Sequence, residues 1–131
     1  MRRERYMAKP INVGRSEDWL QIDLFDGKKF SPSPVRRIPT TDEVLIAYTA
    51  DHCPRAISAR CPHLGVPLAE YARPWERPGT IICSAHQCVF DIRTGEPLAV
   101  NQGFESVPCL GSWALLPQGD GSWVIEGFEE E

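Results

Sequence analysis

Two short pairs of cysteine and histidine constrain the fold of this chain more than any other feature. Cys61 and His63 form the first pair, Cys83 and His86 form the second, and 19 residues separate the two pairs. Ligands one or two residues apart cannot both reach one small metal site from a regular strand, because neighbouring side chains point to opposite faces. The pairs must therefore lie in loops that a rigid scaffold holds together.

The mixture of side chains favours one kind of metal centre. Two thiolates and two imidazoles suit a [2Fe-2S] cluster in which the cysteines bind one iron and the histidines bind the other. Two thiolates leave such an oxidised centre neutral, whereas four leave it at about minus two, and a neutral centre accepts an electron more readily. Pro62 stiffens the first loop, and Gly65 permits a tight turn after it. This ligand set indicates a one-electron carrier.

Zinc is the main alternative metal, since two cysteines and two histidines also satisfy tetrahedral Zn²⁺. Zinc fingers usually begin with a pair of cysteines and end with a pair of histidines. Here each pair holds one residue of each type, which favours iron–sulfur over zinc. A zinc-stabilised binding module therefore stays open only as a less favoured function.

Apolar residues recur with a period of two or in short runs, which indicates strands. Residues 43–49 and 55–59 are expected to pair as antiparallel neighbours, and 112–116 and 122–125 are expected to form a hairpin. Further strands are expected at 19–25, 80–82 and 89–91. The sequence therefore predicts an all-β fold of small antiparallel sheets.

The predicted strands frame one domain, spanning residues 1–131. We expect residues of about 60–102 to form an inserted cluster-binding subdomain, on a base made of about 8–59 and 103–127. A turn near Leu68–Ala72 is the only helix expected. Ser31–Pro34 is expected to be a loop, because prolines and serines alternate there.

The residues around the two pairs resemble the Rieske family. The first match is Cys-Pro-His-Leu-Gly at 61–65, and the second runs from Cys83 to Gly95. Within the second match, Phe90-Asp91 and Thr94-Gly95 are similar to the segment that follows the second ligand pair in Rieske-type ferredoxins of bacterial oxygenase systems. The matched motif covers about a third of the chain, and its spacing is specific.

The resemblance implies the fold, the cofactor and the ligands. It implies a Rieske fold with one [2Fe-2S] cluster per chain. It also implies that Cys61 and Cys83 bind one iron and that His63 and His86 bind the other.

Several departures from the family imply a low reduction potential. High-potential members join the two loops by a disulfide, but the matching positions here are Val66 and Ala85. Those members also place serine and tyrosine hydroxyls near cluster sulfur, where this chain has Cys88 and Phe90. A thiol donates weakly and phenylalanine has no donor. We therefore expect a reduction potential of about −150 mV. Gln87 stands where glycine is common.

The expected function is a soluble, cytoplasmic electron carrier that takes electrons from a flavin-dependent reductase and passes them to an oxygenase. The acceptor would be a Rieske non-haem iron dioxygenase or a di-iron monooxygenase. No substrate chemistry is expected, because a mononuclear iron site needs two histidines and a carboxylate, and only His52 remains after the cluster is bound. A small Rieske subunit of another redox complex, or a redox sensor, is the alternative.

Charge and composition narrow the partners. The net charge of −4 argues against nucleic acid and anionic membranes. No apolar run approaches the ~20 residues needed to span a bilayer. The five cysteines form no recognisable disulfide framework, which is typical of a reducing compartment.

Other residues have both a structural and a functional interpretation. Trp75, in the long Glu70–Gly79 segment between the ligand pairs, could anchor a partner, but packing back over the domain is favoured. A turn residue with neither role is favoured for His52 over a third metal ligand or a proton relay. Cys88 could donate to cluster sulfur or merely pack, and Cys53 and Cys109 are expected to be buried. The remaining expectations are a solvated face at Arg36–Arg37 and core positions for Trp19, Trp113 and Trp123.

Overall fold

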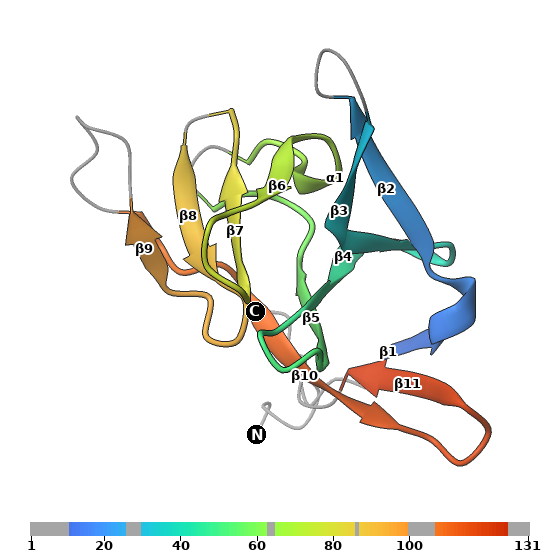
Figure 1. The fold of residues 1–131 in the computed structure, drawn as a ribbon. Coiled ribbons are helices and arrows are strands. Elements are labelled where there is room, and N and C mark those ends of the chain that lie inside the picture. The colour runs from blue at the N-terminus through green and yellow to red at the C-terminus, as the bar shows by residue number, and fades with distance from the viewer. Residues whose placement is uncertain (1–10, 26–29, 63–64, 86, 100–106, 126–131) are drawn as a thin grey trace.

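The computed structural model describes residues 11–25, 30–62, 65–85, 87–99 and 107–125, and nearly all regular structure in them is strand (Figure 1). Two antiparallel sheets are present, which confirms the predicted all-β class. The larger sheet has the strand order β1 (Ile11–Arg15), β11 (Ser122–Ile125), β10 (Ser112–Pro117), β5 (Pro54–Ser58), β4 (Thr41–Tyr48), β3 (Phe30–Ile38) and β2 (Leu20–Phe25).

The smaller sheet comes from the middle of the chain. Its order is β6 (Ala72–Pro74), β7 (Thr80–Cys83), β8 (Cys88–Asp91) and β9 (Pro97–Ala99). A four-residue helix, α1 (Leu68–Tyr71), precedes it, and a short 3₁₀ turn, η2 (Ser16–Asp18), joins β1 to β2. Helix α1 begins where the short helical turn was expected and ends one residue earlier.

The larger sheet is buried on both faces at its centre. In β4, Leu45 and Ala47 point to one face, while Val44 and Ile46 point to the other, and all four are buried. The first face packs against the smaller sheet in a shared core that includes Ile81, Cys83 and Phe90. The second face encloses a separate core. This explains why β4 reads as a continuous apolar run rather than an alternating one.

The second core holds the tryptophan that sequence alone placed there. Trp19 is buried, and its indole N–H donates to the Val13 carbonyl at 2.8 Å. Its ring centroid lies 6.3 Å from that of Trp123. Trp113 and Trp123 are half-buried and pack against the same core. The prediction for Trp19 is thus confirmed, and the other two tryptophans border the core.

The expected loop at Ser31–Pro34 was wrong, because this segment is the first part of β3. Strand β4 pairs with β3 only from Val35 onward, so the segment has a partner on one side, β2. A proline without an N–H breaks no ladder hydrogen bond on an open edge. The pairing register also shifts near Pro34, between Gln21 and Asp23 of the partner strand. Both features accommodate the two prolines.

Candidate metal centre

The first cysteine loop leaves the larger sheet after β5. Cys61 is only 1% exposed, and its N–H donates to the Val66 carbonyl at 2.9 Å. The Gly65 N–H donates back to the Cys61 carbonyl at 2.7 Å. Gly65 has a φ of +80°, a conformation that glycine adopts without strain. These two hydrogen bonds close the loop and fix the buried cysteine at its base.

The second cysteine loop joins β7 to β8. Cys83 ends β7, is fully buried and lies opposite Cys88 in the antiparallel pair. The Gln87 N–H donates to the Cys83 carbonyl at 2.7 Å, and Gln87 has a φ of +64°. The Ser84 N–H donates to the carbonyl of Tyr71, the last residue of α1, at 2.8 Å.

The two loops share one backbone arrangement. In each, the residue four positions after the cysteine has a positive φ and donates its N–H to the cysteine carbonyl at 2.7 Å. Cys61 and Cys83 belong to one core cluster, and Val66 and Ala85 pack against it. In Figure 1, both loops lie at the end of the molecule where β7 meets β8. The fold therefore brings the two predicted thiol ligands to one place.

The predicted imidazole ligands, His63 and His86, lie outside the described residues. Within the part of the chain that is described, no group of three or more His, Cys, Asp or Glu side chains could hold a metal ion. The two thiols nevertheless suit an iron–sulfur centre, because they are buried together at the bases of matched loops. The donor chemistry fits on the cysteine side.

Arg60 supports the first loop, a role that the sequence analysis missed. Its guanidinium Nη1 donates to the Gly65 carbonyl at 2.8 Å, and Arg60 also forms an isolated β-bridge with Pro67. The arginine thus joins the two ends of the loop. Its only sequence signal is a basic residue directly before the first cysteine.

The remaining cysteines differ from one another in burial. Cys88 is buried in the shared core, next to the cross-strand partner Cys83. The expectation that Cys53 and Cys109 are buried was wrong, since both are exposed. Cys53 lies in the tight β4–β5 turn, where its backbone exchanges hydrogen bonds with Thr49 and its side chain faces outward. Near Cys109, Val107 and Leu110 supply the buried side chains instead.

Trp75 is half-buried and lines an apolar hollow together with Tyr48 and His52. This agrees with the interpretation that Trp75 packs back over the domain. His52 is exposed, with a φ of +67° that the tight turn imposes. No described residue of the two cysteine loops lines this hollow.

Charged groups with shifted pKa values lie away from the loops. A hydrogen bond from the Thr49 hydroxyl, with a smaller contribution from Arg93 at 3.4 Å, lowers the pKa of Asp51. Burial, and then repulsion from Arg93, lowers the pKa of Arg55. Arg36 is half-buried beside the Tyr48 ring at 5.7 Å, so only Arg37 keeps the exposure expected of that pair.

Comparison with known families identifies the fold and the cofactor. The family model described as "Rieske [2Fe-2S] domain" matches residues 21–111, which include both cysteine loops. The chain therefore belongs to the Rieske [2Fe-2S] domain family, an electron-transfer module, and it binds one [2Fe-2S] cluster.

Solved structures support the same fold. One similar structure is the terminal oxygenase of carbazole 1,9a-dioxygenase from Novosphingobium sp. KA1, with 19% identity over 90% of this chain and a TM-score of 0.57. The corresponding oxygenase from Nocardioides aromaticivorans IC177 has 20% identity over 90% of this chain and a TM-score of 0.50. This chain covers only 32% of each oxygenase chain. No curated protein sequence matches it. Among the described residues, no helix is long and apolar enough to cross a membrane.

Proposed function

We propose that this protein is a cytoplasmic one-electron carrier, which accepts electrons from a flavin-dependent reductase and donates them to an oxygenase. The burial of Cys61 and Cys83 at the bases of two matched loops carries this proposal. Cys61 and Cys83 would bind one iron, and His63 and His86 the other. When bound, the cluster supplies reversible one-electron transfer.

The ligands divide the chain into two working parts. Residues of about 60–102 would act as the cluster-binding subdomain, and residues of about 8–59 and 103–127 would act as its base. The sheet topology supports this division, because β6–β9 form the smaller sheet and the other strands form the larger one, and the two sheets share a core behind the cysteines. Such a rigid support would keep the ligand loops in one arrangement while the charge of the centre changes.

The chain's own residues would control solvent access and loop geometry. Phe90 and Ile81 lie in the core cluster that contains both cysteines, so they exclude water from the thiolate side of the site. Arg60 and Gly65 hold the first loop closed. Histidine edges are the expected exit for electrons, because carriers need close approach to a partner.

We further propose that the protein has no substrate chemistry of its own. The chain contains three histidines, and binding of the cluster leaves only His52. A mononuclear iron site built from two histidines and a carboxylate could not then form. This chain covers 32% of each of the two oxygenase chains with similar folds.

The test is a reconstituted electron-transfer chain. Purified holoprotein is mixed with NADH and a flavin-dependent reductase, and the visible absorption of the cluster is followed. We expect the visible absorption to bleach and to recover when an oxidised Rieske oxygenase is added. Product should form only when all components are present. Hydroxylation of an aromatic substrate by this chain without an oxygenase would refute the carrier role. The Cys61→Ser variant should lack the visible absorption and transfer no electrons.

A further inference from the structure

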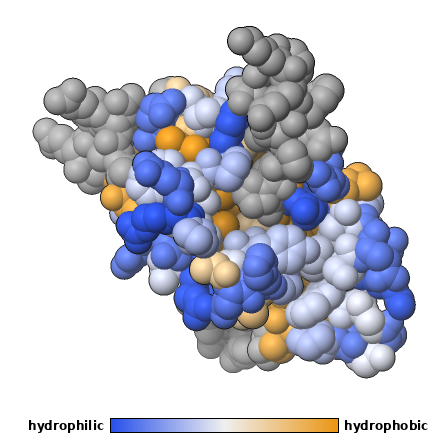
Figure 2. Space-filling model, in the orientation of Figure 1, coloured by the Kyte–Doolittle hydropathy of each residue, from blue (hydrophilic) through white to orange (hydrophobic). Residues whose placement is uncertain are grey.

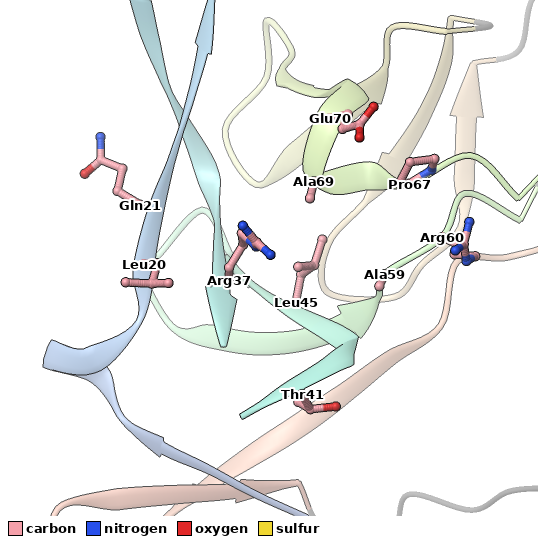
Figure 3. A pocket seen from close by; sticks show the side chains of 10 residues that line it. All are labelled: Leu20, Gln21, Arg37, Thr41, Leu45, Ala59, Arg60, Pro67, Ala69 and Glu70. Carbon is pink, nitrogen blue, oxygen red and sulfur yellow. The ribbon is translucent and has the colours of Figure 1, made fainter. Parts of the chain in front are cut away.

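An open groove lies beside the first cysteine loop, between strand β2 and helix α1 (Figure 3). Its volume is about 740 Å³. Leu20 and Gln21 of β2 form one side, Ala69 and Glu70 of α1 form another, and Arg37 projects between them. The groove is therefore the junction of the larger sheet with the segment that carries the cysteines.

The groove continues the core face of the larger sheet. Leu20, Arg37, Leu45 and Ile57 are cross-strand neighbours on one face, from β2 to β5. Leu45 and Ile57 are buried under the smaller sheet. Leu20, in contrast, is 50% exposed, and Arg37 is exposed. The outer half of this row is uncovered.

An exposed leucine on this face is unusual for the molecule. Only Leu20 and Leu116 are large apolar side chains with high exposure among the described residues. Figure 2 shows the same tendency on the face it displays, where apolar residues form small spots on a mostly hydrophilic surface. An apolar residue at the rim of a concave site can contact a bound segment.

The charge of the groove is opposite to that of the whole protein. Arg37 and Arg60 both line it, and Glu70 is the only acidic residue that does. Within the described residues, Arg37 makes no ion pair, and the one hydrogen bond of the Arg60 guanidinium goes to a carbonyl. The chain as a whole carries −4. The groove therefore presents positive charge on an otherwise acidic protein.

The groove also borders the first cysteine loop. Ala59, Arg60 and Pro67 line it, and these residues directly precede and follow the first cysteine loop. A molecule seated in the groove would thus contact the base of the loop that holds Cys61. A partner held there would lie beside the loop that also carries His63, whose edge is the proposed exit for electrons.

We propose that this groove docks an acidic segment of the redox partner, with separate partner carboxylates facing Arg37 and Arg60 and an apolar side chain against Leu20. The inference rests on the proposed carrier function and adds the chemistry of the partner's contact surface. Charges at the edge of an interface act mainly on association rates and on their salt dependence. The effect of Arg37 should therefore appear in a bimolecular rate constant.

The experiment uses charged inorganic oxidants as probes. Dithionite-reduced holoprotein, freed of excess reductant, is mixed in a stopped-flow instrument with ferricyanide, which takes one electron from the cluster and becomes ferrocyanide. Hexaamminecobalt(III) serves as the cationic one-electron oxidant. At low ionic strength, Arg37→Gln should lower the ferricyanide rate constant about threefold, and Arg37→Glu about tenfold. Neither variant should slow the cationic oxidant, and added salt should remove the differences.

Arg77→Gln is the matched control. Arg77 is also exposed, makes no ion pair among the described residues and lies outside the groove, so it changes the net charge equally. An equal effect of Arg77→Gln and Arg37→Gln on the ferricyanide rate would overturn the proposal. So would a holoprotein dimer that Arg37→Glu dissociates, because the groove would then hold a second copy of the chain.

These probes require neither a reductase nor an oxygenase. If reconstitution fails but Arg37→Gln lowers the ferricyanide rate constant more than Arg77→Gln does, the proposed donor and acceptor are rejected and the groove is kept. If reconstitution succeeds but the two variants have equal ferricyanide rate constants, only the groove is rejected.

Discussion

Gln87 holds a backbone conformation that normally belongs to glycine. Its φ is +64°, and it occupies the position that Gly65 occupies in the other cysteine loop. A side chain in the left-handed region costs about 1–2 kcal/mol, and glycine gives back about 0.5–1 through its flexible unfolded state. Gln87→Gly should therefore raise the free energy of unfolding of the holoprotein by about 0.5–1 kcal/mol, as measured by urea denaturation.

Gln118→Gly provides the control for this prediction. The side-chain amides of Gln87 and Gln118 each donate to a nearby backbone carbonyl at 3.3 Å, but only Gln87 has a positive φ. The Gln118→Gly control should lower the free energy of unfolding by up to about 1 kcal/mol, because the unfolded chain gains flexibility and no strain is relieved. Equal losses in both variants would show that the hydrogen bond to Ser84 outweighs the strain at Gln87.

Cys88 tests the link between donors and reduction potential. It lies opposite Cys83 and is buried, so a better donor at this position would face the thiolate side of the site. Cys88→Ser should raise the midpoint potential by tens of millivolts, on the order expected for one added hydrogen bond to sulfur. Protein-film voltammetry gives the value. Cys53→Ser, at an exposed turn, should leave the potential unchanged, and equal shifts in both variants would refute the role of Cys88.

At the scale of elements, the β8–β9 turn joins the two sheets. The Gly95 N–H donates to the Asp91 carbonyl, and the Leu110 N–H donates to the Gly95 carbonyl, each at 2.7 Å. A Cβ on Gly95 would overlap the Leu110 carbonyl oxygen, whereas a Cβ on Gly65 would meet nothing within 4 Å. Both glycines have a φ near +80°.

Gly95→Ala should therefore destabilise the protein more than Gly65→Ala. We expect a loss of about 0.5–1 kcal/mol at Gly65, where the reduced flexibility of the unfolded state offsets part of the backbone strain, and roughly 2 kcal/mol or more at Gly95, where overlap adds to the strain. The urea midpoints of the two variants, followed by circular dichroism, measure the difference. Equal midpoints would mean that the segment near Leu110 moves aside at little cost.

The elements also show where sequence reasoning succeeds. Strands with apolar periodicity were placed within two residues, because burial on one or both faces dictates their pattern; β4, β7 and β11 are examples. Strands β1, β3, β6 and β9 were missed. Strands β6 and β9 show the reason most clearly. Each has three residues and includes a proline, so its existence depends on a neighbour, β7 or β8, rather than on local preference.

At the scale of the whole molecule, the sequence was sufficient to predict the family and the cofactor. The spacing of Cys61, His63, Cys83 and His86 carried the family resemblance, which the family match confirmed. The hydrogen bond from Arg60 to the Gly65 carbonyl could not be predicted, because it depends on the conformation of the folded loop. The uncovered face at Arg37 could not be predicted either, because the packing of the two sheets sets it.

The whole site also predicts a low-potential carrier. Val66 and Ala85 cannot form a disulfide between the loops, and Phe90 offers no hydroxyl. We expect a midpoint potential of about −150 mV at neutral pH, measured by redox titration followed with EPR. A midpoint above roughly +100 mV would place the protein with the high-potential members and contradict this prediction.

The most direct test of the central claim is the visible absorption spectrum of the purified protein before and after dithionite, with EPR of the reduced sample and metal analysis. A Rieske centre predicts a red-brown protein with two irons and two sulfides per chain, which bleaches on reduction and gives the EPR signal of a [2Fe-2S] cluster bound by both cysteine and histidine. A colourless protein with one zinc per chain would contradict the account and leave a metal-stabilised binding domain.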